Sequence, residues 1–449
     1  MKYYIALICL TFIYICLFIA DNAFIDKFLN PFTIISYIII NVWYLFKFRR
    51  NNIFCFELLF SLSFFICSFL YPFISSQLSD FRANIFVEDA NIQRKSFIIA
   101  FLGYLFYLLG LSLHKNPEKV SNQNWSFDEG IVFFANVICS FILILFYVKG
   151  GANLLTLYSN TYSEGESRLG EWGEFLIYAM YAYTVSFIIV FQARKTRTDS
   201  FYSFLCSLPL HFYLNSAFLL IPLFVSGYRS NFVQLFIPMI VLYSMSIKRI
   251  KGIHLILLLL GGVVILQIIG FTRNGEELNT EQLETMDYLR DFIGPNGALS
   301  FLINYADHHG ITEGSNYLLP VLSIIPYLQT VFSIFINFDN LATSSSVFYT
   351  QSFDSSSGLG TNIIGDLYYT FGPFGVVVLM FFMGLILRKF YFFKTPIGLT
   401  MLLVFTGNAL FAPRVEYVYI IRSIGFSGLL MLFLLTVSKV NYTHSSMRS

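Results

Sequence analysis

Long, uninterrupted apolar runs dominate this chain and constrain its fold more than any other feature. Most runs are about 17–25 residues long, the length of a helix that crosses the hydrocarbon core of a bilayer. With 56% hydrophobic and only 12% charged residues, the chain has too few charges to cover its apolar surface in water. Inside lipid only helices and closed barrels satisfy the backbone, and a barrel strand would alternate over about 10 residues. The sequence therefore predicts an all-α polytopic integral membrane protein.

About twelve of these runs are predicted membrane spans. The first follows Lys2 and is interpreted as an uncleaved span, because no clean small-x-small cleavage site follows it. The runs cover residues 3–20, 31–46, 53–75, 96–113, 130–148, 174–192, 201–225, 230–247, 253–271, 374–387, 396–412 and 417–438.

The basic residues in the connections predict the orientation of the spans. When the N-terminus is placed inside, most of the 28 Lys and Arg residues fall in cytoplasmic connections and most of the 26 Asp and Glu residues fall outside. Both termini are then predicted to be cytoplasmic. We expect residues 1–449 to form a single membrane domain, with one large external loop, residues 272–362, between the ninth and tenth spans.

This external loop contains segments that we expect to lie along the membrane. Asn279 and Gln282 resemble a capping box, and the residues that follow, as far as Ile293, have the pattern of an amphipathic helix. Such a helix either lies parallel to the bilayer or packs as a lid on the helical bundle. Leu318–Phe338 is long enough to span, but it contains two prolines, and a span here would move the basic cluster after residue 387 outside. We expect a re-entrant or interfacial pair of short helices there, and a flexible segment over residues 344–358.

Arginines at the outer ends of the spans are the first candidates for function. Arg229 lies in a tight turn between two runs, at a depth where an unpaired guanidinium is costly. It either reaches lipid headgroups or binds an anionic group such as a lipid-linked phosphate. Arg414 and Arg422 are about two helical turns apart, so on one helix they would share a face. Arg273 and Arg290 complete the set, and ordinary salt bridges to nearby acids are the alternative for these four.

Asp366 is the first candidate for a general base. Glycines and Pro373 are expected to break the helix just before the tenth span, which leaves Asp366 in an apolar, outward-facing stretch. Partial desolvation makes a carboxylate a stronger base, as proton abstraction requires. The alternative is a buried Asp that accepts hydrogen bonds from backbone amides at the start of a helix. His309 and Glu416 are the reserve candidates, although His309 has the alternative of an ordinary surface histidine.

Missing motifs exclude several classes of protein. The chain has no P-loop, no Gly-x-Gly-x-x-Gly turn and no Asp-x-Asp motif, which argues against a nucleotide-driven pump and a cytoplasmic nucleotide-sugar enzyme. No His-Glu-x-x-His or similar spacing is present, so no metal and no cofactor is expected. The net charge of +2 does not indicate binding to nucleic acid.

Three motifs resemble the Wzy-type O-antigen or oligosaccharide repeat-unit polymerases. They are Gly227-Tyr-Arg229-Ser230 at the start of a span, Gly314-Ser-Asn-Tyr317 followed by Pro320 and Ile325-Pro326, and Gly358-Leu-Gly through Gly365-Asp366-Leu-Tyr368-Tyr369-Thr-Phe-Gly372. The resemblance covers roughly residues 220–390 and rests on the order of the motifs and on the large loop between the ninth and tenth spans.

The resemblance implies a glycosyltransferase of GT-C-like architecture in the bacterial inner membrane, with its active site facing the periplasm. Such an enzyme joins undecaprenyl-pyrophosphate-linked oligosaccharides by inverting, metal-independent transfer and makes O-antigen or a related surface polysaccharide. It needs no cofactor and binds no nucleic acid. Besides these oligosaccharides and membrane lipid, its candidate partners are a chain-length regulator and a flippase of the same pathway.

The candidate residues fit that chemistry. Negative charge grows on the leaving lipid pyrophosphate as the glycosidic bond breaks, and guanidinium groups at the outer interface would stabilise it. The pyrophosphate-binding candidates are Arg229, Arg273, Arg290, Arg414 and Arg422. The acceptor hydroxyl needs a base, first Asp366 and then His309 or Glu416. Tyr317, Tyr368 and Tyr369 offer ring faces and hydroxyls to sugars, although ordinary interfacial aromatics explain them equally well.

Two other functions remain open. An O-antigen ligase-type glycosyltransferase would use the same donor with a different acceptor. A lipid-linked oligosaccharide flippase would be a transporter, and transporters usually show repeated halves and charges near the bilayer midplane. Here the charges lie at the outer edge and a single loop dominates, which favours the polymerase.

Overall fold

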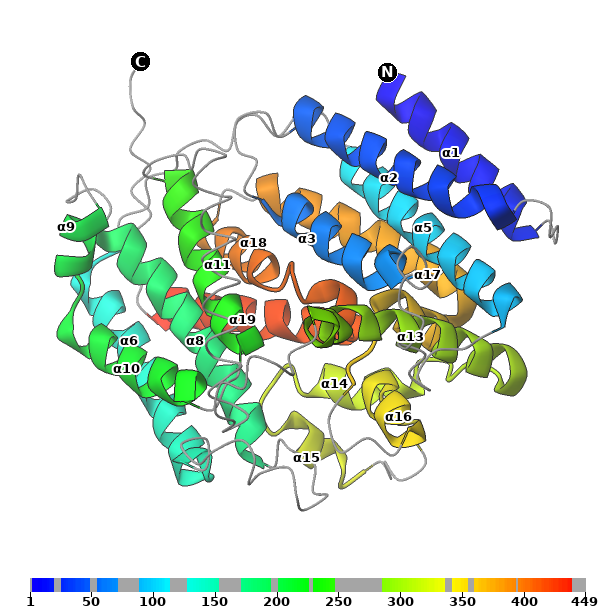
Figure 1. Ribbon diagram of the computed structural model, residues 1–449. Helices are drawn as coiled ribbons and strands as arrows, with labels where there is room; N and C mark the ends of the chain where they lie inside the picture. Colours follow the sequence, from blue (N-terminus) through cyan, green and yellow to red (C-terminus); the bar gives the residue numbers. More distant parts are fainter. Residues whose placement is uncertain are drawn as a thin grey trace. The chain divides into compact units, whose positions relative to one another are not determined.

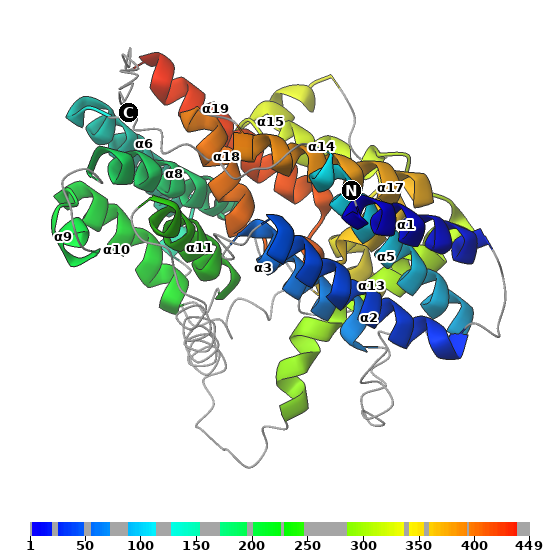
Figure 2. The ribbon, with the colours of Figure 1, turned by 90° about the horizontal axis from the view of Figure 1, so that it is seen from above.

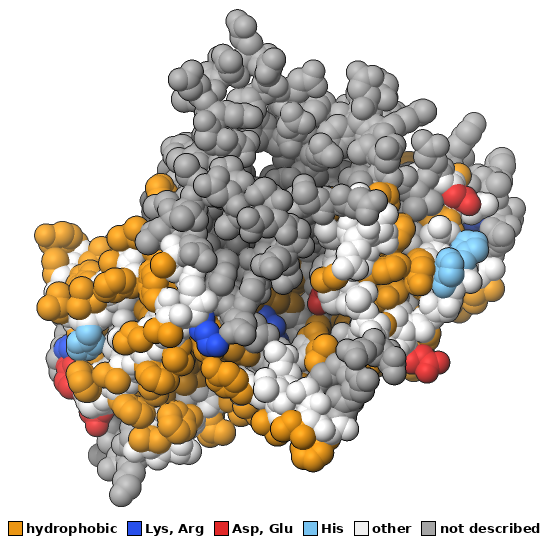
Figure 3. Space-filling view, turned by 90° about the horizontal axis from the view of Figure 1, so that it is seen from below, with side chains coloured by type: hydrophobic (Ala, Val, Ile, Leu, Met, Phe, Trp, Pro, Cys, Tyr) orange, Lys and Arg blue, Asp and Glu red, His pale blue; other side chains and the backbone are white. Residues whose placement is uncertain are grey.

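The computed structural model describes most of the chain, and every regular element in that part is a helix (Figure 1). The described residues are 2–19, 26–48, 55–71, 89–113, 127–152, 171–194, 201–225, 229–246, 285–335, 341–353, 359–392 and 395–437. The predicted all-α class is confirmed. Large apolar side chains such as Phe46, Val148 and Phe374 are about three-quarters exposed, and Figure 3 shows hydrophobic side chains over broad areas of one face. Such a surface suits helices surrounded by lipid.

Among the described residues, six helices are long and apolar enough to cross a membrane. They are Pro31–Phe48, Ala90–Ser112, Glu129–Val148, Phe175–Arg194, Ile363–Phe392 and Tyr417–Val437. Shorter apolar helices are Tyr3–Ile19, Phe56–Leu70, Leu210–Phe224, Asn231–Ser246 and Pro396–Gly407. Each predicted span coincides with one of these helices except 253–271, which lies outside the described residues. The count of twelve spans and the cytoplasmic termini stay predictions.

The helices group into two compact units. Unit 1 comprises Met1–Lys119, Leu283–Phe392 and Asn408–Arg422, and unit 2 comprises Val120–Gln282, Phe393–Gly407 and Ser423–Ser449. The single membrane domain and the bounds of the external loop stay predictions.

Unit 1 is built around α5 (Ala90–Ser112) and α17 (Ile363–Phe392), which lie side by side (Figure 1). Two glycines let their backbones meet. A Cβ on Gly110 would lie 2.2 Å from the carbonyl oxygen of Phe381, and a Cβ on Gly384 would lie 2.2 Å from that of Tyr107. Small residues at such crossings permit close helix packing in membranes. Unit 1 also contains α1 (Lys2–Ile19), α2 (Asp26–Phe48), α3 (Phe56–Phe65), η2 (Ile66–Leu70) and α13 (Thr285–His309); α1 and α2 run along α5 (Figure 2).

Short elements of unit 1 fill the region predicted as the external loop. They are the 3₁₀ turn η6 (Ser315–Tyr317), α14 (Leu318–Leu322), α15 (Leu328–Phe332) and α16 (Ser345–Ser352). Over the described part of Leu318–Phe338 the chain forms two short helices, separated by a turn in which Tyr327 has φ 63°. The expected flexible segment at 344–358 was wrong in its first half, because α16 forms there and buries Ser345 and Tyr349 completely.

The helix α17 begins well before the predicted start of the tenth span at residue 374. The side-chain oxygen of Asn362 accepts a hydrogen bond from the Ile364 N–H at 2.9 Å, which satisfies a free amide of the first turn. The expected break by glycine and proline occurs as a kink at Gly372, where φ is 69° and Pro373 follows. Asp366 therefore lies in the first turn of a helix rather than in a loop before it.

Unit 2 contains α6 (Glu129–Val148), α8 (Glu171–Arg194), α9 (Phe201–Cys206), α10 (Leu210–Val225), α11 (Arg229–Ser246), α18 (Pro396–Gly407) and most of α19 (Tyr417–Val437). The Asn215 side chain donates to the Asn136 carbonyl oxygen at 3.0 Å, so a polar contact joins α10 to α6. The predicted span 201–225 is broken between α9 and α10, where Pro209 removes a backbone donor.

Candidate active site

A fully buried carboxylate, Asp366, joins three separate segments of unit 1 to α17. Its Oδ1 accepts a hydrogen bond from the Ser345 hydroxyl at 2.6 Å, at the start of α16. Its Oδ2 accepts from the Tyr417 backbone N–H at 2.9 Å, at the start of α19, and from the Tyr317 hydroxyl in η6. These bonds fix α16, η6 and the first residue of α19 relative to the first turn of α17.

The η6 turn is held to α17 by further polar contacts. The Asn316 amide donates to the Thr370 hydroxyl at 3.0 Å, and that hydroxyl donates to the Asp366 carbonyl oxygen at 2.7 Å. Burial, and next the negative charge of Asp366, raise the pKa of Tyr317 well above its usual value. The Tyr317 phenol therefore stays protonated at physiological pH and keeps donating to Asp366. The motifs around Tyr317 and Asp366, distant in sequence, thus meet in the structure.

Glu416 lies immediately before Tyr417 and is half-buried. Its Oε1 accepts hydrogen bonds from the Ser346 backbone N–H, at 3.3 Å, and from the Ser346 hydroxyl. Two consecutive serines, Ser345 and Ser346, thus hold two different carboxylates. Both contacts use Oε1, so within the described residues no hydrogen bond reaches Oε2.

Two of the predicted arginines flank Glu416 in unit 1. Arg414 is half-buried in the 3₁₀ turn η7 (Ala412–Arg414), and its carbonyl oxygen accepts from the Thr361 N–H at 3.4 Å. In the part of the chain that the structure describes, its guanidinium has no ion-pair or hydrogen-bond partner. Arg422 is also half-buried, and its Nη1 donates to the Ser323 hydroxyl at 3.2 Å.

The expectation that Arg414 and Arg422 share one helical face was wrong. Val415 is extended, with φ −124° and ψ 167°, and α19 begins only at Tyr417. Pro413 lacks the backbone donor that a continuous helix needs there, and Asp366 satisfies the first amide of the new helix instead.

Three further arginines, Arg229, Arg273 and Arg290, were predicted to bind the pyrophosphate. Arg229 is the first residue of α11 in unit 2, and Arg290 lies within α13 in unit 1. Their side chains lie outside what the structure describes, as does Arg273 entirely. Their predicted roles stay predictions.

The remaining candidates, Tyr368, Tyr369 and His309, contact residues other than Asp366. The Tyr368 hydroxyl donates to Asp307 Oδ1 at 2.8 Å. The Tyr369 ring stacks on Phe348, with ring centroids 5.5 Å apart. His309 is exposed at the end of α13, and its ring stacks on Tyr305 at 4.4 Å.

Comparison with known proteins identifies the family. The family model of the O-antigen polysaccharide polymerase Wzy matches residues 3–444, nearly the whole chain. The chain belongs to this Wzy family. No curated protein and no solved structure matches it. The resemblance seen in the three motifs is confirmed, and this Wzy-family chain is a multi-pass bacterial membrane protein whose family polymerises O-antigen from lipid-linked oligosaccharide repeat units.

Sequence reasoning missed two serines that organise this Wzy-family site, Ser345 and Ser346. They belong to a serine run that resembled a linker, although serine is also a preferred residue at the start of a helix. That preference was the one available signal for α16. Nothing in the sequence indicated which carboxylates they would contact, because those lie 21 and 70 residues away.

Proposed function

We propose that this Wzy-family protein joins undecaprenyl-pyrophosphate-linked oligosaccharide repeat units at the periplasmic face of the inner membrane, for O-antigen or a related surface polysaccharide. The growing chain moves from its lipid carrier to the non-reducing sugar of the incoming unit. A hydroxyl of that sugar attacks the anomeric carbon of the chain, and the bond to the pyrophosphate breaks. The bonding electrons leave with the lipid pyrophosphate, the hydroxyl proton passes to a base, and the configuration inverts, without a metal.

The observation that carries this proposal is the short segment that holds Arg414 and Glu416. One end of the segment is bound by Thr361, just before α17, and the other end by Asp366 in the first turn of α17. Thr361 binds the Arg414 carbonyl oxygen, and Asp366 binds the amide that follows Glu416. A half-buried guanidinium is stabilised by an anion, which the leaving pyrophosphate supplies. Because the segment is fixed in advance, Arg414 stabilises the growing charge without reorganisation. Arg422 offers a second guanidinium, and Arg229, Arg273 and Arg290 remain further candidates.

Glu416 has the best geometry for the general base. It is half-buried, its Oε2 is open within the described residues, and it is two residues from Arg414. Asp366, the first candidate from the sequence, is fully buried, and three hydrogen bonds occupy most of its lone pairs, so an acceptor hydroxyl cannot reach it in this arrangement. This geometry favours the alternative role of a buried Asp at a helix start. We therefore assign Asp366 to positioning and Glu416 to proton abstraction, with His309 in reserve.

Deletion of the gene, followed by gel analysis of the surface glycan, tests this function. A polymerase predicts loss of the ladder with a single repeat unit still attached to its acceptor. Loss of all attached glycan would contradict the proposal and indicate a ligase or a flippase.

Complementation of the deletion tests the role of Arg414. Arg414→Ala at normal protein level should restore only the single-unit glycan, because removal of one donor to developing charge costs about 10²–10³ in rate. Lys389→Ala, at an exposed position near the other end of α17, is the matched control and should restore the ladder. Long chains from Arg414→Ala would exclude pyrophosphate stabilisation by this residue.

A further inference from the structure

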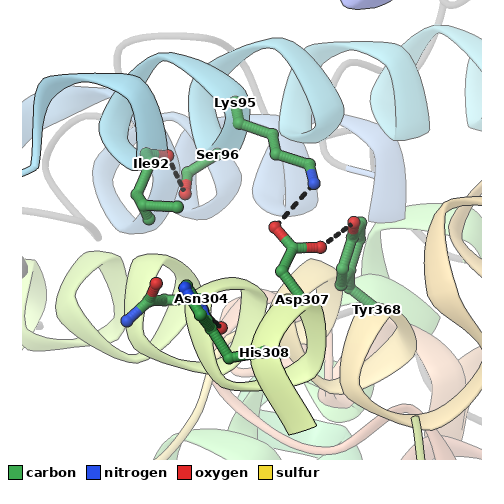
Figure 4. A network of polar contacts seen from close by, with 7 residues as sticks. All are labelled: Ile92, Lys95, Ser96, Asn304, Asp307, His308 and Tyr368. Carbon is green, nitrogen blue, oxygen red and sulfur yellow. Dashed lines mark hydrogen bonds and ion pairs between the residues drawn. The ribbon is translucent and has the colours of Figure 1, made fainter. Parts of the chain in front are cut away.

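A second polar cluster in unit 1 joins three helices (Figure 4). Lys95 of α5 and Tyr368 of α17 both point toward Asp307 of α13. The Lys95 Nζ is 2.6 Å from Asp307 Oδ2, and the Tyr368 hydroxyl donates to Oδ1 at 2.8 Å. The side chains of Lys95 and Asp307 are 31% and 26% exposed, so a ligand can reach both charged groups.

The first turns of α17 place this cluster close to the candidate active site but on the other side of the helix. Tyr368 follows Asp366 by two positions. With 3.6 residues per turn, two positions differ by about 200°, so the two side chains leave opposite faces of α17. The cluster and Asp366 therefore lie at the same end of one helix, separated by roughly its 10 Å width.

Aromatic rings extend from the same end of α13. His309 stacks on Tyr305, and Tyr305 meets Phe348 edge-on with centroids 4.6 Å apart. Phe348 in turn stacks on Tyr369, the residue after Tyr368. His309 is exposed, and Tyr305 and Phe348 are partly exposed, so ring surface lies beside the charged pair.

Stability alone is a weak explanation for the cluster. Partly exposed ion pairs contribute little to stability, since solvent screens them and two long side chains must be ordered. The close backbone packing at Gly110 and Gly384 already joins α5 to α17. The combination matches what a sugar ring needs: a carboxylate and a phenol oxygen that accept hydrogen bonds from its hydroxyls, an ammonium that donates to its oxygens, and a flat ring for its C–H face.

We propose that Lys95, Asp307 and Tyr368, with the Tyr305–His309 ring pair, form a subsite that binds an uncharged pyranose of the growing glycan, away from the bond being made. An uncharged sugar fits because the ion pair has no net charge. The growing chain is the occupant because it carries sugars beyond the reacting end at every round. This inference rests on the proposed polymerase function. Binding at this subsite retains the chain between rounds, so it sets chain length rather than the rate of one linkage.

Complementation of the deletion strain tests the subsite, with the cell's own lipid-linked repeat units as the probe. The double variant Lys95→Ala/Asp307→Ala should keep the two-unit product and normal protein level, and should lower the modal chain length by roughly half or more as retention weakens. The charge swap Lys95→Asp/Asp307→Lys restores an ion pair but misplaces the groups that bind sugar, so it should give the same short ladder. The control is Glu129→Ala/Arg194→Ala, which removes another ion pair, of 2.6 Å, in unit 2 and should leave the ladder unchanged.

Each other outcome contradicts a specific claim. A normal ladder from the charge swap would show that the pair only supports the fold, and a normal ladder from the double Ala variant would exclude any role in chain retention. Loss of even the two-unit product at normal protein level would place the cluster in the chemistry and overturn a remote subsite. A wild-type gene that restores no ladder would overturn the polymerase function itself, and the subsite with it.

Discussion

Replacing Asp366 by Asn and Glu416 by Gln tests which of the two carboxylates positions the site and which one acts as the base. In Asp366→Asn the amide oxygen, placed at Oδ2, still accepts from Tyr317 and from the Tyr417 amide. The new NH₂ group then faces Ser345, whose hydroxyl rotates to accept. Only the strength of charge-assisted bonds is lost, so the free energy of unfolding should fall by about 1–2 kcal/mol.

The alanine variant at the same position gives the upper limit of the loss in free energy of unfolding. Asp366 is 0% exposed, and Asp366→Ala removes the acceptor of three donors, which belong to the buried Ser345 and Tyr417 and to the half-buried Tyr317. Each unsatisfied donor costs about 1–3 kcal/mol, which amounts to about 3–9 kcal/mol before relaxation. We expect little folded protein in the membrane. The measurements are size-exclusion profiles and thermal melts of the detergent-solubilised protein.

In contrast to the Asp366 variants, Glu416→Gln should lose activity and keep its stability. The amide oxygen keeps both hydrogen bonds from Ser346, so the melting temperature should stay near that of the wild type. An amide accepts no proton from the acceptor sugar, and loss of a general base lowers the rate by about 10²–10⁴. The assay is formation of linked repeat units by the protein in nanodiscs. A stable but inactive Asp366→Asn together with an active Glu416→Gln would reverse the assignment and make Asp366 the base.

Two further predictions concern packing and the serine pair. Gly110→Ala and Gly384→Ala should each lower the yield of folded protein in size-exclusion profiles, because a Cβ 2.2 Å from a backbone oxygen forces α5 and α17 apart. The control is Gly294→Ala, which should leave the yield unchanged because no atom lies within 4 Å of the added Cβ. Ser345→Ala should lower the free energy of unfolding by about 1 kcal/mol and should keep the glycan ladder. Ser346→Ala should lower activity more than stability, because Glu416 loses the hydrogen bond from the Ser346 hydroxyl that orients it. A stability loss confined to Ser346→Ala would contradict this division.

Much of the fold was predictable because helices that cross a lipid bilayer require long apolar runs, which are easy to find in a sequence. Apolar runs located the helices, and Gly372 with Pro373 marked the kink in α17. The early start of α17 was missed because its first turns, around Asp366, contain glycine and polar residues that resemble a loop. Tertiary contacts with η6, α16 and α19 stabilise those turns, and such contacts come from residues 49, 21 and 51 positions away.

The candidate site was predictable in residue type but not in arrangement. Arginines at the ends of apolar runs are conspicuous in so apolar a chain, and Arg414, Arg422 and Glu416 were all candidates from the sequence. Their geometry was not predicted, because the break at Val415 depends on the hydrogen bond that Asp366 accepts from the Tyr417 backbone N–H. The roles of Arg229, Arg273 and Arg290 stay predictions.

The central claim is that Arg414 and Arg422 bind the diphosphate of the lipid carrier. Equilibrium binding of undecaprenyl pyrophosphate to the protein in nanodiscs tests it most directly. Each charge-assisted contact contributes about 1.5–3 kcal/mol, and 1.4 kcal/mol is tenfold in affinity, so Arg414→Ala/Arg422→Ala should weaken binding by at least about 100-fold. Equal affinity of the wild type and the double variant would contradict the account.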